Sequence, residues 1–132
     1  MKYLLDTNIC IYYLKNKYEI DKRIKDAGLN NCSISEITIA ELKFGIEKSE
    51  QKEKNQKVIQ DFIDSIAIIP LISSFDVYAK EKVRLRKEGN IIDEFDLLIG
   101  ATVIANNMIL VTKNISHFER FENIKIENWV KE

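Results

Sequence analysis

The stretch Tyr3-Leu4-Leu5-Asp6-Thr7-Asn8 decides the fold of this chain. Three apolar residues, enough for a short buried strand, run directly into three polar residues that favour helix caps and tight turns. A mainly apolar sequence resumes at residues 9–14, which predicts a helix there. A strand, a turn and a helix in immediate succession are typical of an α/β protein with a parallel sheet.

The alternation continues along the rest of the chain. Further strands are predicted at residues 31–35, 67–71, 108–111 and 124–127, and further helices at 18–27, 36–49, 50–66, 75–87 and 94–107. Residues 113–121 form a polar connection. This order predicts an α/β sandwich with a mainly parallel central sheet of about five strands flanked by helices, in a single domain over residues 1–132.

The composition is that of an ordinary globular protein. Hydrophobic residues make up 45% and charged residues 31% of the 132 residues, and there are only 4 Gly and 1 Pro, which excludes collagen-like and disordered classes. The net charge of −1 gives no overall positive field, so any nucleic-acid binding must be local. We expect Cys10 and Cys32 to be buried and reduced, no membrane span, and a cytoplasmic location.

Three acidic residues stand where a parallel sheet gathers its functional groups. Asp6 follows the first strand, Glu41 lies on the helix after the second strand, and Asp96 lies in the first turn of the helix before the fourth strand. Ligand sites in such sheets form at the carboxyl ends of the strands, so these carboxylates are predicted to converge. Crowded carboxylates repel one another and suit a hard cation such as Mg²⁺, with Mn²⁺ as a substitute.

Each acid also has a structural interpretation. Asp6 fits a helix cap as well as a metal ligand, and Asp96 fits an acid that the helix dipole favours in the first turn. Glu41 shares a helix face with Ile37, Ala40 and Phe44, where a lone ionised carboxylate is costly. Glu41 is therefore expected to bind a metal ion, and a buried salt bridge to a basic side chain is the alternative.

The helix at residues 36–49 carries a second apolar stripe, formed by Ile39, Leu42 and Ile46. Two stripes predict a helix that is buried on two sides. Together with the helix that starts at Phe75, the second stripe suggests the surface of a homodimer.

Five short motifs of the sequence resemble those of a known family. The resemblance rests on Asp6-Thr7-Asn8, Ala40-Glu41-Leu42, Asp96-Leu97-Leu98, Val111-Thr112-Lys113-Asn114 and Glu127-Asn128-Trp129, in order and over nearly the whole chain. These motifs are similar to those of the PIN-domain superfamily and, within it, of VapC-type toxin ribonucleases of toxin–antitoxin pairs.

The resemblance implies a metal-dependent endoribonuclease whose acidic residues are Asp6, Glu41 and Asp96. It implies supporting roles for polar residues beside them, namely Thr7, Asn8, Thr112 and Asn114, and it implies a cognate VapB-type antitoxin as a partner. Many relatives carry another acid after the fourth strand, where this chain has Asn114 and, three residues on, His117. The sequence is therefore compatible with either one or two bound metal ions.

The RNA substrate requires local positive charge. Lys43 and Lys113 are chosen as RNA contacts because they are close to the acids in sequence, although lysines on solvated helix faces are the commoner case. His117 is given no general-base role, because a metal ion can activate water without one.

Two other functional classes fit parts of the pattern. A phosphorelay receiver also has an acidic pocket on a parallel sheet, but it needs an Asp after its central strand, and residues 66–74, taken as that strand, contain none. An inert PIN-like module that only binds a protein partner is the second alternative, and the intact set of acids argues against it.

Overall fold

The computed structural model describes residues 2–131, so both end residues of the predicted domain 1–132 lie outside the described range. The strands in that range are β1 (Tyr3–Leu5), β2 (Cys32–Ser35), β3 (Ala67–Ile69), β4 (Ile109–Val111) and β5 (Ile126–Glu127). The α-helices are α1 (Thr7–Leu14), α2 (Ile20–Ala27), α3 (Glu36–Lys48), α4 (Lys52–Ser65), α5 (Phe75–Lys87), α6 (Glu94–Ala105) and α7 (Ile115–Phe118), and the 3-10 helices are η1 (Leu29–Asn31) and η2 (Leu71–Ser74).

The central sheet has the strand order β3-β2-β1-β4-β5, and every pair in it is parallel. The predicted α/β class with a five-stranded parallel sheet is confirmed. The chain first fills one side of β1 with β2 and β3 and then returns to the other side with β4 and β5. The strand order therefore reverses between β1 and β4, where parallel sheets open a crevice beyond the strand ends.

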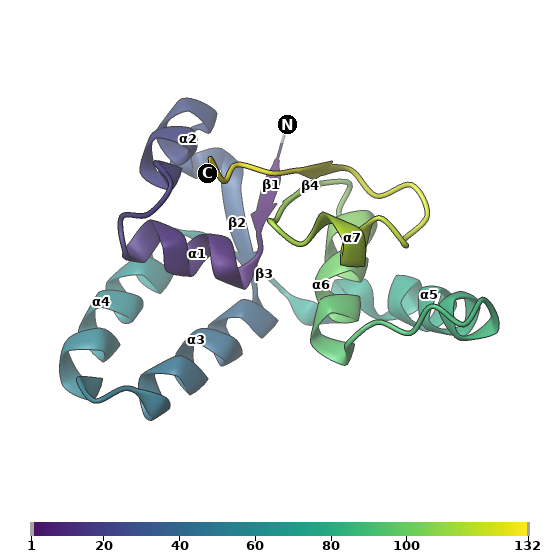
Figure 1. Ribbon diagram of the computed structural model, residues 1–132, viewed down its shortest axis with the longest axis horizontal. Helices are drawn as coiled ribbons and strands as arrows, with labels where there is room; N and C mark the ends of the chain where they lie inside the picture. The colour runs from purple at the N-terminus through teal and green to yellow at the C-terminus, as the bar shows by residue number, and fades with distance from the viewer. Residues whose placement is uncertain (1, 132) are drawn as a thin grey trace.

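Two apolar cores cover the two faces of the sheet. Successive strand residues point to opposite faces, so Leu4 and Leu110 join the core beneath α5, α6 and α7, whereas Leu5 and Val111 join the core beneath α1, α2 and α4. In Figure 1 these two groups of helices lie on either side of the central strands. The result is a three-layer arrangement that holds the ends of β1 and β4 rigidly.

Three boundaries differ from the sequence-based expectation. Helix α1 starts earlier than predicted, at Thr7, because Asp6 caps it. Helix α2 starts later, at Ile20, because Tyr18 and Glu19 adopt left-handed φ angles of 58° and 55°, which end any helix. The predicted polar connection at 113–121 contains the short helix α7.

The prediction that α3 is buried on two sides holds only near its start, where Ile37 is buried in the core beneath α5, α6 and α7. Leu42 and Ile46 are buried, but Phe44 is 63% exposed, and Ala40 is exposed beside it. Because Leu42 packs into the core beneath α1 and α4, this part of the stripe is not available for the predicted dimer surface.

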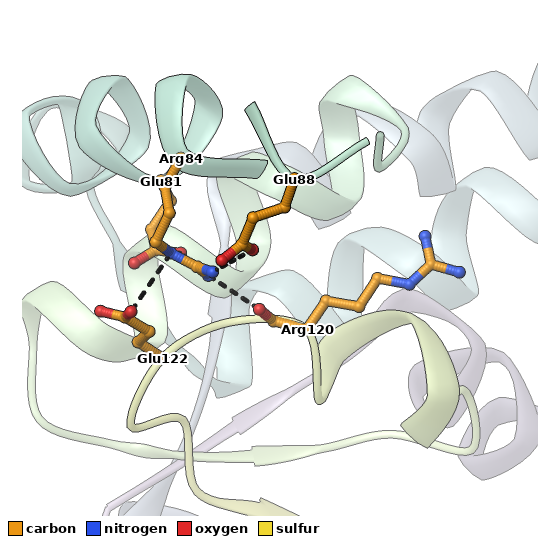
Figure 2. Close-up of polar contacts among 5 residues, drawn as sticks. All are labelled: Glu81, Arg84, Glu88, Arg120 and Glu122. Atoms are coloured by element: carbon orange, nitrogen blue, oxygen red, sulfur yellow. Dashed lines mark hydrogen bonds and ion pairs between the residues drawn. The ribbon is translucent and has the colours of Figure 1, made fainter. Parts of the chain in front are cut away.

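A charged cluster fastens α5 to the segment between α7 and β5 (Figure 2). The Arg84 guanidinium donates to Glu81 and, at 2.7 Å, to both Glu88 Oε2 and the carbonyl of Arg120, and it lies 3.7 Å from Glu122 Oε1. Glu81 is buried, so a charged partner offsets the cost of taking its carboxylate out of water. The cluster therefore links α5 to residues 120–122, which follow α7.

Two simpler expectations concern the cysteines and the membrane. Cys10 and Cys32 are both free and buried, as predicted. No helix among residues 2–131 has the length and apolar character needed to cross a bilayer.

Candidate active site at the ends of β1 and β4

The neighbouring ends of β1 and β4 bring Asp6 and Thr112 together. Leu5 pairs with Val111 in the sheet, and the Asp6 N–H donates to the Val111 carbonyl at 2.9 Å, so the ladder continues one residue past β1. Thr112 Oγ1 then donates to Asp6 Oδ2 at 2.8 Å. The backbone N–H of Asn114 donates to the same Thr112 oxygen at 3.0 Å, which fixes the loop after β4 against Asp6.

Asp6 is both a helix cap and a buried acid. Its Oδ1 accepts the Thr7 N–H at 2.8 Å, and its side chain is only 5% exposed. Burial raises the pKa of Asp6 to about 6, against the opposing effect of the hydrogen bonds from Thr112 and Thr7, and the charges of Asp96 and Glu41 raise it further. The two interpretations of Asp6 are therefore compatible, because the two oxygens of one carboxylate make different bonds.

Glu41 is held by hydroxyl groups. Thr7 Oγ1 donates to Glu41 Oε1 at 2.6 Å, and the same Thr7 oxygen lies 3.0 Å from Thr38 Oγ1. Burial raises the pKa of Glu41, the Thr7 bond lowers it, and the charges of Asp96 and Asp93 raise it. Thr38 was not among the predicted site residues, although its position one turn before Glu41 on α3 is a signal that could have identified it.

Asp96 lies in the first turn of α6, which Asp93 caps by accepting the Phe95 N–H at 3.2 Å. His117 Nδ1 of α7 lies 3.5 Å from Asp96 Oδ2. Burial raises the pKa of Asp96, the His117 contact lowers it, and the charge of Asp93 raises it. His117 thus faces a site acid across the loop after β4, a contact that its position in the sequence did not predict.

Electrostatic coupling puts the three predicted acids in one neighbourhood. Asp96 raises the pKa of both Asp6 and Glu41, and Glu41 raises the pKa of Asp6. Within residues 2–131, however, no three acidic, imidazole or thiol groups stand together as a ready-made metal cluster. Mg²⁺ does not require one, because it binds through one or two carboxylates and keeps several water ligands. The carboxylates present therefore fit a Mg²⁺ ion that keeps water molecules as its remaining ligands.

The other predicted residues lie at varying distances from this centre. Asn8 is exposed in the first turn of α1. Lys113 directly follows Thr112 in the sequence, and its ammonium group lies 5.7 Å from the centre of the Tyr18 ring. Lys43 follows Glu41 by two residues, which turns it about 200° around the helix. It lines a hollow with Phe44 and Gln56 instead, so closeness in sequence to Glu41 does not bring Lys43 to the acids.

An apolar groove of about 290 Å³ begins at Glu41. Helices α1, α3 and α4 form its walls, which are lined by Ile11, Leu14, Leu42, Ile46, Val58 and Ile59 among others. Because Glu41 lines the groove and is also one of the three site acids, a molecule lying in the groove would reach the site.

Comparison with known proteins assigns this geometry to a family. The family model described as "PIN domain" matches residues 3–124. The chain belongs to the PIN-domain family. The match excludes the phosphorelay receiver. The central strand is β1 and not residues 66–74, however, and an acid, Asp6, does follow it.

Relatives within this family are similar over their full length. Ribonuclease VapC2 of Rickettsia felis is 40% identical, covering 99% of this chain and 100% of its own, and the tRNA(fMet)-specific endonuclease VapC of Salmonella typhimurium is 31% identical, with 98% of each chain covered. A chain in the crystal structure of VapBC2 from Rickettsia felis bound to a promoter DNA fragment has a TM-score of 0.91 at 38% identity, covering 98% of this chain and 99% of that one.

Proposed function

We propose that this PIN-domain protein is a metal-dependent endoribonuclease, the toxin of a toxin–antitoxin pair. The observation that carries the proposal is that the buried Asp6 after β1 shares one neighbourhood with the half-buried Glu41 of α3 and Asp96 of α6, whose charges raise its pKa. Neighbouring acids that repel one another in this way are well suited to a divalent cation. Full-length relatives named as ribonucleases and endonucleases support the same activity.

Mg²⁺, or Mn²⁺ in its place, is the cofactor that we infer. Asp6 and Asp96 would hold it directly, and Glu41 would hold it directly or through a water molecule. When bound, the ion supplies a water of lowered pKa and neutralises charge on the phosphate oxygens during cleavage.

The residues of this chain prepare the acids for that role. The Thr7 N–H and the Thr112 hydroxyl fix the two oxygens of Asp6, so the carboxylate cannot rotate. These donors are neutral, so they orient the carboxylate without cancelling its charge. Glu41, fixed by Thr7, is placed to orient the attacking water, and Lys113 beside Tyr18 is a candidate contact for the RNA backbone.

The first prediction separates the nuclease from an inert PIN-like binding module. Total RNA is incubated with the protein in Mg²⁺, in Mn²⁺ and in excess EDTA, and new 5′ ends are mapped by sequencing. We expect cleavage with either metal, none in EDTA, and a rate that falls by orders of magnitude in Asp6→Asn, which keeps the shape of the side chain but removes its charge. Undiminished cleavage in EDTA, or a fully active Asp6→Asn protein that binds its antitoxin, would contradict the proposal.

A VapB-type antitoxin is the protein partner that we infer, since similar solved structures are VapBC complexes. We propose that an apolar segment of the antitoxin lies in the groove between α1, α3 and α4 and covers Glu41. The RNA substrates and the antitoxin both imply action in the cytoplasm.

The second prediction tests the groove. Val58 lines it and is 42% exposed, so Val58→Glu should put a charge in the groove without disturbing the core. We expect antitoxin affinity, measured by calorimetry, to fall at least about tenfold, as for a charge left unpaired in an apolar contact, while RNA cleavage is kept. Leu29→Glu is the matched control, because Leu29 is 39% exposed in η1 and lies outside the groove. Equal antitoxin affinity of the two variants would rule out the groove.

A further inference from the structure

Three oxygen-bearing side chains form a chain of hydrogen bonds between α1 and α3. Thr38 Oγ1 lies 3.0 Å from Thr7 Oγ1, which lies 2.6 Å from Glu41 Oε1. Thr38 is held in turn by the start of its own helix, because its N–H donates to Ser35 Oγ, the N-cap of α3, at 3.3 Å. The end of β2 therefore fixes Thr38, and Thr38 meets the first residue of α1.

The direction of these bonds follows from counting protons. A threonine hydroxyl has one hydrogen to donate and two lone pairs, whereas an ionised carboxylate can only accept. The single Thr7 hydrogen must point to Glu41, since otherwise a Thr7 lone pair would face a carboxylate oxygen at 2.6 Å. Thr7 can then only accept from Thr38. The order is therefore Thr38 to Thr7 to Glu41, with every hydrogen directed toward the acid.

We propose that Thr38 is a positioning residue for Glu41, which it orients through Thr7; this inference rests on the proposed nuclease function. The Thr38 hydroxyl occupies a lone pair of Thr7 and so stops rotation of the Thr7 hydroxyl, and donors in series strengthen one another in a buried site. Glu41 Oε1 is thereby committed to Thr7, and Oε2 is the oxygen that serves the reaction. The arrangement also couples the orientation of Glu41 to the contact between α1 and α3.

Burial decides how Thr38 can act. Its side chain is only 1% exposed, so it cannot touch an RNA molecule or water in the crevice. Its removal should consequently change the turnover of bound RNA and leave the binding of RNA unchanged. A residue that merely packs α1 against α3 would instead change stability and leave the kinetic constants alone.

The kinetic test compares Thr38→Val, which keeps the shape and removes the hydroxyl, with Thr38→Ser, which keeps the hydroxyl. The assay follows cleavage of an RNA that wild type cuts, chosen from the mapped 5′ ends, at saturating Mg²⁺. We expect Thr38→Val to lower kcat about tenfold with KM within about twofold, the scale of a misplaced catalytic group, and Thr38→Ser to restore kcat to within about twofold. In a Thr7→Val background, Thr38→Val should have no further effect on kcat.

Thr102→Val is the matched control. Thr102 is likewise a fully buried threonine, but its hydroxyl donates within its own helix, to the Leu98 carbonyl at 2.8 Å. We expect its kcat to equal that of wild type. Three results would overturn the proposal and leave the nuclease function standing. The first is a wild-type kcat in Thr38→Val, and the second is a loss of kcat in Thr38→Ser as large as in Thr38→Val. The third is that the losses of kcat from Thr7→Val and Thr38→Val multiply in the double variant.

A second readout requires neither RNA nor metal. Urea unfolding in EDTA should give the Thr7→Val/Thr38→Val double variant a midpoint no lower than that of Thr7→Val, because the Thr38 hydroxyl loses its acceptor once Thr7 is replaced. If wild type cleaves no RNA, the nuclease proposal fails, and this cycle still tests the hydrogen-bond chain. Midpoint losses that add would show that the two hydroxyl groups are not linked, which would overturn the inference.

Discussion

Asp6 shows how one residue can serve the fold and the site together. Its Oδ1 caps α1 and its Oδ2 accepts from Thr112, while its burial and neighbouring acids raise its pKa. In the sequence a cap and a metal ligand are alternatives for Asp6, because a pattern of residue types does not assign roles to individual oxygens. The capping bond is local and could be predicted, whereas the bond to Thr112 depends on the pairing of β1 with β4.

The third prediction concerns the pH dependence that follows from Asp6. Its pKa is raised from 3.8 to about 6 in the folded, metal-free protein. A raised pKa means that its stabilising effect is present below pH 3.8 and is lost as pH rises through about 6. At neutral pH wild type therefore carries an unfavourable contribution from Asp6, which Asp6→Asn lacks.

Urea unfolding in EDTA at pH 4 and pH 7 measures this effect. We expect the stability of Asp6→Asn relative to wild type to rise between the two pH values by up to about 3 kcal/mol, from about 1.4 kcal/mol per pKa unit. Lys57→Gln, with an exposed ion pair on α4, is a control that should show no such trend. A difference between Asp6→Asn and wild type that does not change with pH would contradict the raised pKa.

Helix α3 illustrates what periodicity predicts about an element and what it does not. Its Leu42 stripe is covered by α1 and α4, but its Ala40 and Phe44 positions are exposed and Glu41 lies between the two environments. Both stripes are apolar in sequence, and only the packing of other helices determines which one is covered. The inference that Glu41 is unusual survives, because it rested on a partly buried charge and not on the number of buried faces.

The fourth prediction uses two glycines inside helices as a matched pair. A Cβ atom at Gly45 of α3 would meet nothing within 4 Å, whereas one at Gly100 of α6 would lie 2.4 Å from Phe121 Cζ. Gly45→Ala should raise the free energy of unfolding by about 0.5–1 kcal/mol through helix propensity. Gly100→Ala should lower it by about 1–3 kcal/mol through overpacking. Chemical denaturation of both variants measures the signs, and a stabilising Gly100→Ala would contradict the packing of Phe121.

At the scale of the whole molecule, an apolar surface remains uncovered around α5. It consists of large exposed side chains in η2, in α5, in the connection to α6 and in the first turn of α6, namely Ile72, Phe75, Val83, Ile91 and Phe95. Ile72 and Ile91 are each 75% exposed. Such clusters in soluble proteins mark interaction surfaces, so we expect the homodimer to form here, without the α3 stripe that sequence analysis had included.

The fifth prediction is that Val83→Glu yields a monomer where wild type is a dimer, measured by light scattering after gel filtration. In a two-fold symmetric interface one substitution introduces two charges, which are costly to bury without partners. Val58→Glu, on the opposite group of helices, is the control and should remain dimeric. A dimeric Val83→Glu protein would move the interface elsewhere.

Local features follow from residue types and spacing alone: the strand, turn and helix from Tyr3 onward and the cap at Asp6. These depend on neighbours within about one helical turn, so residue types and spacing are sufficient to predict them. The strand order and the covered face of α3 depend on tertiary packing. So do the contact of Thr112 with Asp6, 106 residues apart, and the contact of Thr38 with Thr7, 31 residues apart. Such contacts depend on which strands pair and which helices cover them. That choice is made by burial of the whole apolar surface at once, and no short stretch of sequence contains it.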